Sequence, residues 1–166
     1  MARAAGLDHI AAATGSTSEA AVRRLHDLPE IALIDMGDFV GGMLKYLRRH
    51  PVPRLTLAGG FGKMAKLAAG HLDLHSARSR IDGAALALRL ERDGAPDAVI
   101  AASRDTASAG EAYARVAAIA PDAAASLAQS VAGDARKVAL DRLGPGIAVD
   151  VALFDRNGEL IAHAGP

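Results

Sequence analysis

The segment RLTLAGGFGKMAKLAAGHLDLHSARS, residues 54–79, combines the elements around which the rest of the chain is arranged. Its first residues, 54–58, are mostly apolar and alternate with a period of two, which predicts a buried strand. The glycine-rich stretch 59–62 predicts a turn, and residues 63–69 predict a short helix that ends at Gly70. A strand, a glycine turn and a helix N-terminus in this order point backbone N–H groups at an anion. The segment therefore predicts an anion-binding site.

Two shorter strand–helix units precede this segment. Residues 8–13 and 30–35 predict strands, and helices are expected over residues 18–26 and 39–50. Strands that alternate with helices pair in parallel through right-handed crossovers. The first half of the chain therefore predicts an α/β fold with a parallel, Rossmann-like sheet and flanking helices.

The second helix of these units carries two specific predictions. Asp38 is expected to be its N-cap, because a carboxylate accepts hydrogen bonds from the first free N–H groups. Gly41 and Gly42 each lower helix stability by about 1 kcal/mol relative to Ala. We therefore expect a neighbouring element or a ligand to approach the backbone closely at these glycines.

The second half of the chain predicts a helical segment followed by a C-terminal β-hairpin. The strands of the hairpin, residues 147–154 and 159–164, flank the turn sequence Asp155-Arg-Asn157-Gly158. Helices are expected over residues 82–91, 96–103, 108–119 and 121–143, with a break at Gly133 as an alternative. We expect one α/β domain over residues 1–166.

Composition excludes several classes of protein. The 166 residues include 19 basic and 19 acidic side chains, so no general affinity for nucleic acid or for an anionic membrane is expected. The absence of Cys excludes disulfides and thiolate chemistry. No apolar run is long enough to cross a membrane and no signal-peptide pattern opens the sequence, so a cytoplasmic protein is expected.

Three polar motifs fall where predicted strands end: TGSTSE at residues 14–19, DMGD at 35–38 and GGFGK at 59–63. Ligands of open parallel sheets bind outside the carboxyl ends of the strands. An acidic residue such as Asp35 can accept hydrogen bonds from ribose hydroxyls there, or it can simply cap a helix. GGFGK is not a phosphate-binding Walker A loop, because Leu57 and Met64 replace the required glycine and hydroxyl residue.

Basic side chains gather after the glycine-rich stretch. Lys63 and Lys66 lie three residues apart on one helical face, and Arg78 and Arg80 follow. A solvated basic face and a site for a polyanionic ligand both fit this spacing. Lys63, at the start of the helix, is equally open to two interpretations, an anion contact and a surface lysine.

His71, Asp73 and His75 are spaced by two, so an extended segment would point all three to one side. Such residues suit a transition metal or general acid–base catalysis. Ligands on successive pleats of one strand would not surround an ion, so we predict polar contacts rather than a metal site. The other histidines are isolated in the sequence and are interpreted as surface or loop residues: His9, His26, His50 and His163.

Taken together, TGSTSE, MGDFVGGMLKYLRRHPVPRLTLAGG, GKMAKLAAGHLDLHS and RSRID closely resemble the C-terminal half of the CbiD family. This resemblance, strongest over residues 6–82, implies cobalt-precorrin-5B C1-methyltransferase activity in cobalamin biosynthesis, with S-adenosylmethionine as the methyl donor. It also implies an additional N-terminal domain that this sequence lacks, so an N-terminal-half partner or a homo-oligomer is expected. The family usually has Arg where this chain has Ser16.

The resemblance also implies roles for the candidate residues. The expected donor-binding residues are Thr14, Gly15, Asp35, Asp38, Gly59 and Gly60. The residues expected to bind the carboxylates of the tetrapyrrole substrate are Lys63, Lys66, Arg78 and Arg80, and those expected to handle a proton are His71, Asp73 and His75. The alternative is a non-catalytic domain that binds an anion or a tetrapyrrole, or that serves assembly, and needs the N-terminal half for activity.

Overall fold

The computed structural model describes residues 6–75 and 79–166. Its centre is a five-stranded sheet in the order β2-β1-β3-β4-β5, in which the first four strands are parallel and β5 is antiparallel to β4. The strands are β1 His9–Ala13, β2 Leu33–Asp35, β3 Arg54–Gly60, β4 Ala148–Phe154 and β5 Leu160–Ala164. The predicted α/β class, with a parallel sheet and a C-terminal hairpin, is confirmed.

The register places the carboxyl ends of three strands side by side. Ala13 of β1 pairs with Ala58 of β3, and Gly60 of β3 pairs with Phe154 of β4. The strand order turns at β1, because β2 lies on one side of it and β3 on the other. In a parallel sheet this reversal leaves a crevice at the carboxyl ends of the two inner strands.

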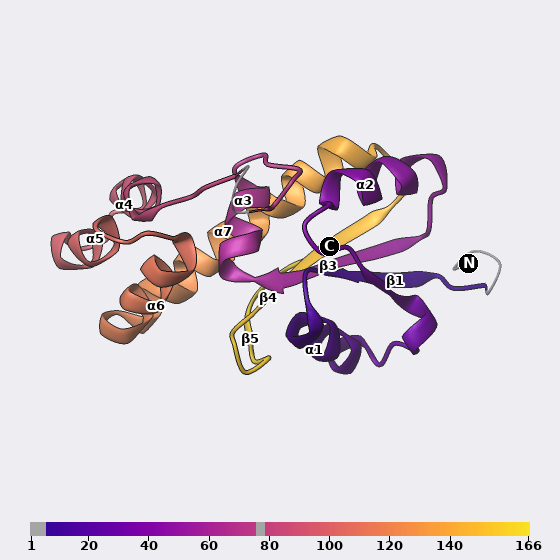
Figure 1. The fold of residues 1–166 in the computed structure, drawn as a ribbon, viewed down its shortest axis with the longest axis horizontal. Helices are drawn as coiled ribbons and strands as arrows, with labels where there is room; N and C mark the ends of the chain where they lie inside the picture. Colours follow the sequence, from indigo (N-terminus) through magenta and orange to yellow (C-terminus); the bar gives the residue numbers. More distant parts are fainter. Residues whose placement is uncertain (1–5, 76–78) are drawn as a thin grey trace.

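Helices cover both faces of the sheet (Figure 1). Helix α1, Ser16–His26, packs on one face, and the long α7, Pro121–Leu143, packs on the other together with α2, Val40–Arg49, and α3, Phe61–Ala68. Three further helices stand beyond the carboxyl ends of the strands: α4 Gly83–Arg92, α5 Asp97–Arg104 and α6 Ala109–Ile119. None of the helices in the described part of the chain is long and apolar enough to span a membrane.

The two faces bury different side chains. The face under α2, α3 and α7 carries large aliphatic residues such as Leu55, Leu57 and Val151 within an extensive apolar core. The face under α1 carries mainly alanines at its carboxyl half, including Ala11 and Ala58. Small side chains there let α1 pack close to the sheet, because helix-to-sheet distance follows side-chain volume.

Local capping signals predicted three helix ends correctly. The Asp82 carboxylate accepts from the Ala85 N–H at 3.1 Å, and the Ser108 hydroxyl accepts from the Glu111 N–H at 3.2 Å. Gly70 follows α3 with a φ of +88°, a conformation that favours glycine. Helix α7 continues through Gly133, so the alternative of a break there is wrong.

Other local predictions about the bounds and caps of elements are wrong. Residues Glu30–Ala32 form a 3-10 helix, because the Ala32 N–H donates to the Pro29 carbonyl at 2.9 Å, and only Leu33–Asp35 forms the strand. Gly59 and Gly60 belong to β3 rather than to a turn. Helix α2 begins at Val40, and the carboxylate of Asp38 binds Lys63 instead of capping the helix.

The close approach expected in α2 occurs at Gly41. The Gly41 N–H donates to the Leu72 carbonyl at 2.9 Å, and a Cβ on Gly41 would lie 2.8 Å from the Cβ of Leu72. The Leu74 N–H in turn donates to the Asp38 carbonyl at 2.8 Å. The segment after α3 therefore closes the start of α2 with its own backbone. Gly42 has open space around it, so the prediction fails at that position.

Candidate functional site

A cleft of about 680 Å³ lies at the carboxyl ends of β1, β3 and β4. We call it the carboxyl-end cleft. It is lined by Thr14, Gly15, Ser16, Thr17, Ser18, Gly60, Phe61, Gly62, Gly110, Tyr113, Ala114, Phe154, Asp155, Arg156, Asn157 and Ile161. The cleft thus occupies the crevice that the strand order creates, where ligands of this fold bind.

Two helix N-termini begin at this cleft without a side-chain cap. Helix α1 follows Gly15, and α3 follows Gly60, and neither residue carries a capping side chain. Side chains of the first turns, from Ser16 and Phe61, line the cleft wall. The first N–H groups of a helix lack intrahelical acceptors and carry partial positive charge. These helix ends therefore favour an acceptor or an anion in the cleft.

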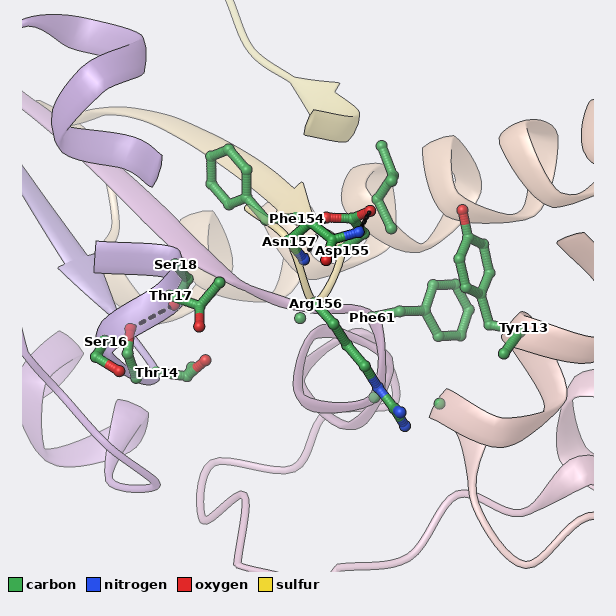
Figure 2. Close-up of a pocket in the computed structure, with 16 residues that line it drawn as sticks. Thr14, Ser16, Thr17, Ser18, Phe61, Tyr113, Phe154, Asp155, Arg156 and Asn157 are labelled. Atoms are coloured by element: carbon green, nitrogen blue, oxygen red, sulfur yellow. Dashed lines mark hydrogen bonds between the residues drawn. The ribbon is translucent and has the colours of Figure 1, made fainter. Parts of the chain in front are cut away.

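The side of the cleft that faces the start of α1 is aromatic. The rings of Phe61 and Tyr113 stack with centroids 4.3 Å apart and an interplanar angle of 18°. Burial and the nearby charge of Asp155 raise the pKa of the Tyr113 hydroxyl, so it stays protonated at neutral pH. Figure 2 shows Arg156 reaching between this pair and the hydroxyl-bearing residues at the start of α1, Thr14 to Ser18.

A second cleft, of about 720 Å³, adjoins the first; we call it the basic cleft. Its basic residues are Lys63, Lys66, Arg80 and Arg156. It shares four residues with the carboxyl-end cleft: Gly60, Gly62, Gly110 and Arg156. At the junction, a Cβ on Gly62 would lie 3.5 Å from the Gly110 nitrogen. Two glycines thus lie close together where a hydroxyl-lined cleft adjoins a cationic one.

The two lysines of the basic cleft already have partners in the protein. Lys63 forms an ion pair with Asp38, and Lys66 donates to the Leu74 carbonyl at 2.8 Å. Burial lowers the pKa of Lys66, and the positive charge of Lys63 lowers it further. Arg80 and Arg156 make no ion pair with another described residue, and Arg80 is exposed. The arginines are therefore the cations best placed for an added anion.

The structure brings together half of the residues expected to bind the donor. Thr14, Gly15 and Gly60 line the carboxyl-end cleft. Gly59 is buried, and a Cβ there would lie 2.6 Å from Cε of Met64 and 2.8 Å from Oγ1 of Thr14, so packing explains this glycine. The remaining two, Asp35 and Asp38, do not line the cleft; Asp35 accepts from the Gly37 N–H at 3.0 Å within its own turn.

The residues expected to handle a proton lie elsewhere. His71, Asp73 and His75 belong to an irregular segment rather than to a strand, and the Asp73 carboxylate accepts from the His75 N–H at 3.1 Å. None of the three lines either cleft, as far as the described residues define the clefts. Their catalytic role stays a prediction. Arg78 lies outside the described residues.

A second polar cluster lies on the sheet face under α1, towards the amino ends of the strands. Its centre is Asp150, whose side chain is completely buried in β4. Arg54 donates to its Oδ1 at 2.9 Å, and the Thr56 hydroxyl donates to its Oδ2 at 2.8 Å. Nε2 of His163 lies 3.1 Å from Oδ2, and Nε2 of His26 lies 3.4 Å from it. His9 completes this group, which we call the Asp150 cluster, with its Nε2 2.7 Å from the Thr56 hydroxyl oxygen.

The environment sets the charges of this cluster. Burial alone would raise the pKa of Asp150, but hydrogen bonds from Arg54, His163 and Thr56, together with the charge of Arg54, hold that pKa below its ordinary value. Burial lowers the pKa of His9 and of His26, and Arg54 lowers both further. The centre is therefore one carboxylate facing several imidazoles.

Sequence reasoning missed the Asp150 cluster, since it treated His9, His26 and His163 as isolated. One local signal was present: Asp150 interrupts the otherwise apolar strand AVDVALF. A carboxylate at an inward position of a buried strand requires polar partners. Those partners come from sequence-distant elements, so local spacing could not name them.

The fold and the carboxyl-end cleft define a class of protein: an α/β domain with a ligand site at the point where the strand order reverses. Comparison with known proteins narrows this class. Residues 73–165 match the family described as CbiD, C-terminal domain. The chain belongs to the CbiD family. No solved structure gave a significant match.

Several curated relatives are similar along nearly the whole chain. A protein of Methylorubrum extorquens is 54% identical over 166 residues, covering 98% of this chain and 44% of the relative. Proteins of Halorhodospira halophila and Paramagnetospirillum magneticum are 52% and 50% identical over 99% of this chain, which covers 43% and 44% of their lengths. All three are named cobalt-precorrin-5B C(1)-methyltransferase. The chain thus spans less than half the length of these relatives.

Proposed function

We propose that this chain forms the donor- and substrate-binding part of an S-adenosylmethionine-dependent methyltransferase that acts on C1 of cobalt-precorrin-5B in cobalamin biosynthesis. The carrying observation is the carboxyl-end cleft at the strand-order reversal, in a chain about half identical to proteins named for this reaction. The match covers 44% of the relative from Paramagnetospirillum magneticum, so more than half of that protein has no counterpart in this chain.

The carboxyl-end cleft supports the donor assignment. S-adenosylmethionine carries an amino-acid carboxylate, ribose hydroxyls and an adenine ring. The uncapped N-termini of α1 and α3 offer N–H groups to the carboxylate. The hydroxyls of Thr14 and Ser16 suit the ribose, and the partly buried Tyr113 offers an aromatic edge to the adenine.

The basic cleft supports the substrate assignment. Corrin precursors carry acetate and propionate side chains, which are anionic at neutral pH. Arg80 and Arg156 offer guanidinium groups that bind carboxylates through two parallel hydrogen bonds. The shared wall at Gly62 and Gly110 brings the two clefts into contact, as transfer between a bound donor and a bound acceptor requires. The main contribution of this chain to methyl transfer would be to align the sulfonium methyl group of the donor with the carbon nucleophile of the substrate.

One observation favours the alternative of a binding domain that depends on the other half for catalysis. Within the described residues, neither cleft is lined by a histidine. The one carboxylate of the linings, Asp155, accepts hydrogen bonds from the backbone N–H groups of Asn157 and Glu159 at 2.8 Å and so holds the hairpin turn. The groups that move a proton, if the reaction needs them, would then come from the additional sequence of the relatives.

Calorimetry with S-adenosylhomocysteine tests the donor assignment with two matched variants. A Cβ on Gly110 in α6 and one on Gly133 in α7 both meet open space, but only Gly110 lines the clefts. We expect Gly110→Val to weaken binding at least tenfold by filling the junction, and Gly133→Val to bind as the parent does. Equal binding by both variants would show that the donor does not bind in this cleft.

The same titration distinguishes the proposed methyltransferase from the alternative of a binding domain that depends on the other half for catalysis. This chain would be compared with a form joined to the N-terminal portion of a relative. Binding by the joined form alone would place the donor site across both portions. Methylation of the corrin precursor by this chain alone would eliminate the non-catalytic domain as an interpretation.

A further inference from the structure

The geometry of the Asp150 cluster points to a second site, which we propose binds a divalent transition-metal ion of the Zn²⁺ type through His26, Asp150 and His163. Nε2 of His26 and Nε2 of His163 lie 3.4 and 3.1 Å from the same carboxylate oxygen, Oδ2 of Asp150. One ligand atom from each of the three residues lies within 4.8 Å of the others. Ligand atoms of tetrahedral zinc, bonded at 2.0–2.1 Å, lie about 3.3 Å apart. The two separations from Oδ2 thus match those between ligands of one small ion.

The unsatisfied Nε2 of His26 favours a bound cation over a cluster that is held by hydrogen bonds alone. Its Nε2 is buried and has no hydrogen-bond partner among the described residues, although it lies near a carboxylate oxygen. Buried polar atoms are nearly always satisfied, and a buried exception requires an explanation. An ion bound between this nitrogen and the carboxylate would give the nitrogen the partner that it lacks.

The surrounding residues orient the carboxylate as an outer shell does at known metal sites. The Thr56 hydroxyl donates its only proton to Asp150, so its oxygen accepts from Nε2–H of His9 at 2.7 Å. Arg54 holds Oδ1, which turns Oδ2 towards the two imidazoles. Partners of this kind fix ligand orientation, and their loss typically lowers metal affinity about 10–100-fold.

The ligand set and its exposure define the ion and its role. Two imidazoles and one carboxylate are the protein ligands of several zinc sites, which leave a fourth position open. The His163 side chain is 35% exposed and that of Asp150 is fully buried, so solvent reaches the site from the β5 side. The ligands come from the end of α1, from β4 and from β5. A bound ion would fasten α1 to the sheet, at the opposite half of the strands from the clefts.

Zn²⁺ binding to the metal-free protein tests the proposal, with tetrahedral Co²⁺ absorption as the geometric readout. We expect one ion per chain, visible Co²⁺ bands of tetrahedral type, and a Tm increase of about 5–10 °C at hundredfold excess over Kd. His163→Gln and His26→Gln should each weaken Zn²⁺ binding at least 100-fold, because each removes a ligand. His163 lies in the last strand, so its variant keeps the test informative if His26→Gln fails to fold.

Two control variants separate this site from ordinary surface binding. His50→Gln removes a histidine outside the cluster, whose ring contacts Tyr46. The double variant His71→Gln/His75→Gln removes the two histidines that the sequence analysis considered for a metal. Both controls should bind Zn²⁺ as the parent does. Absence of stoichiometric binding, or binding that survives His163→Gln and is lost in the double variant, would overturn the proposal.

Discussion

The two halves of the sheet carry opposite kinds of polar chemistry. At the carboxyl ends of the strands, hydroxyls, glycines and arginines surround two open clefts, and Ser16, Thr17 and Arg156 among them are exposed. Under α1, towards the amino ends, the carboxylate of Asp150 is fully buried and hydrogen bonded on both oxygens. The first region has spare hydrogen-bonding capacity for a ligand, whereas the second has used nearly all of its capacity within the protein.

This difference separates two reasons for polar residues to gather. Buried polar groups must find partners, so the Asp150 cluster contributes to stability and specifies packing between α1 and the sheet. Polar groups around an open cleft need no partner in the protein, so they are available for recognition. We therefore expect substitutions in the first region to change the binding of the donor and of the tetrapyrrole, and substitutions in the second to change stability and the binding of the proposed ion.

Removal of the buried carboxylate should have the largest effect. Asp150→Ala leaves Arg54 and Thr56 without their acceptor and should lower the free energy of unfolding by about 2–4 kcal/mol. Asp35→Ala, at the exposed end of β2, should change it by less than about 0.5 kcal/mol. Urea denaturation in the presence of a chelator measures both. Equal stability of the two variants would show that the cluster contributes nothing to the fold.

The next effect compares Gly59, which is buried in β3, with Gly15, which lines the carboxyl-end cleft. Gly59→Ala places a Cβ against Met64 and Thr14 and should cost about 1–2 kcal/mol of stability. Gly15→Ala adds its Cβ to open space and should leave stability within about 0.5 kcal/mol while it weakens S-adenosylhomocysteine binding. Thermal unfolding and calorimetry of the two variants separate packing from ligand access. Destabilisation by Gly15→Ala of the same size would assign that glycine to the fold.

The smallest expected effect concerns the cations of the basic cleft. Arg156→Ala should weaken binding of a tetrapyrrole polycarboxylate such as uroporphyrin roughly fivefold, about 1 kcal/mol, and the loss should shrink as salt rises. Lys63→Ala should weaken it less, because Asp38 already neutralises that ammonium group. Fluorescence titration at two salt concentrations measures both. A larger loss of affinity in Lys63→Ala than in Arg156→Ala would instead place the bound anion at the start of α3.

Sequence periodicity predicted the elements that depend on local pattern. The alternation in β3 and β4 and the caps at Asp82 and Ser108 are local signals, and the sequence predicts all four, although it ends β3 two residues early. Residues 30–32 were predicted as strand because their apolar alternation hides a turn that begins at Pro29. Asp38 looked like a helix cap because its lysine partner lies 25 residues away.

The candidate site was predictable only in part, for the same reason. Thr14, Gly15 and Gly60 reach the cleft because parallel strands end at a common edge, which is a rule that sequence can apply. The contribution of the second half was not visible, since Tyr113 and Arg156 reach the cleft only through the placement of α6 and the final hairpin. The Asp150 cluster joins residues that are far apart in the sequence, such as His26 and Asp150, so no local periodicity could reveal it.

The division of the sheet into a binding end and a stabilising end is tested most directly by amide chemical shifts. S-adenosylhomocysteine would be titrated into the ¹⁵N-labelled chain and followed by two-dimensional NMR. We expect chemical-shift changes at the glycines of the carboxyl-end cleft, Gly15, Gly60, Gly62 and Gly110, and unchanged amides at His26 and Asp150. Shifts concentrated at His26 and Asp150, with the cleft glycines unmoved, would contradict this expectation.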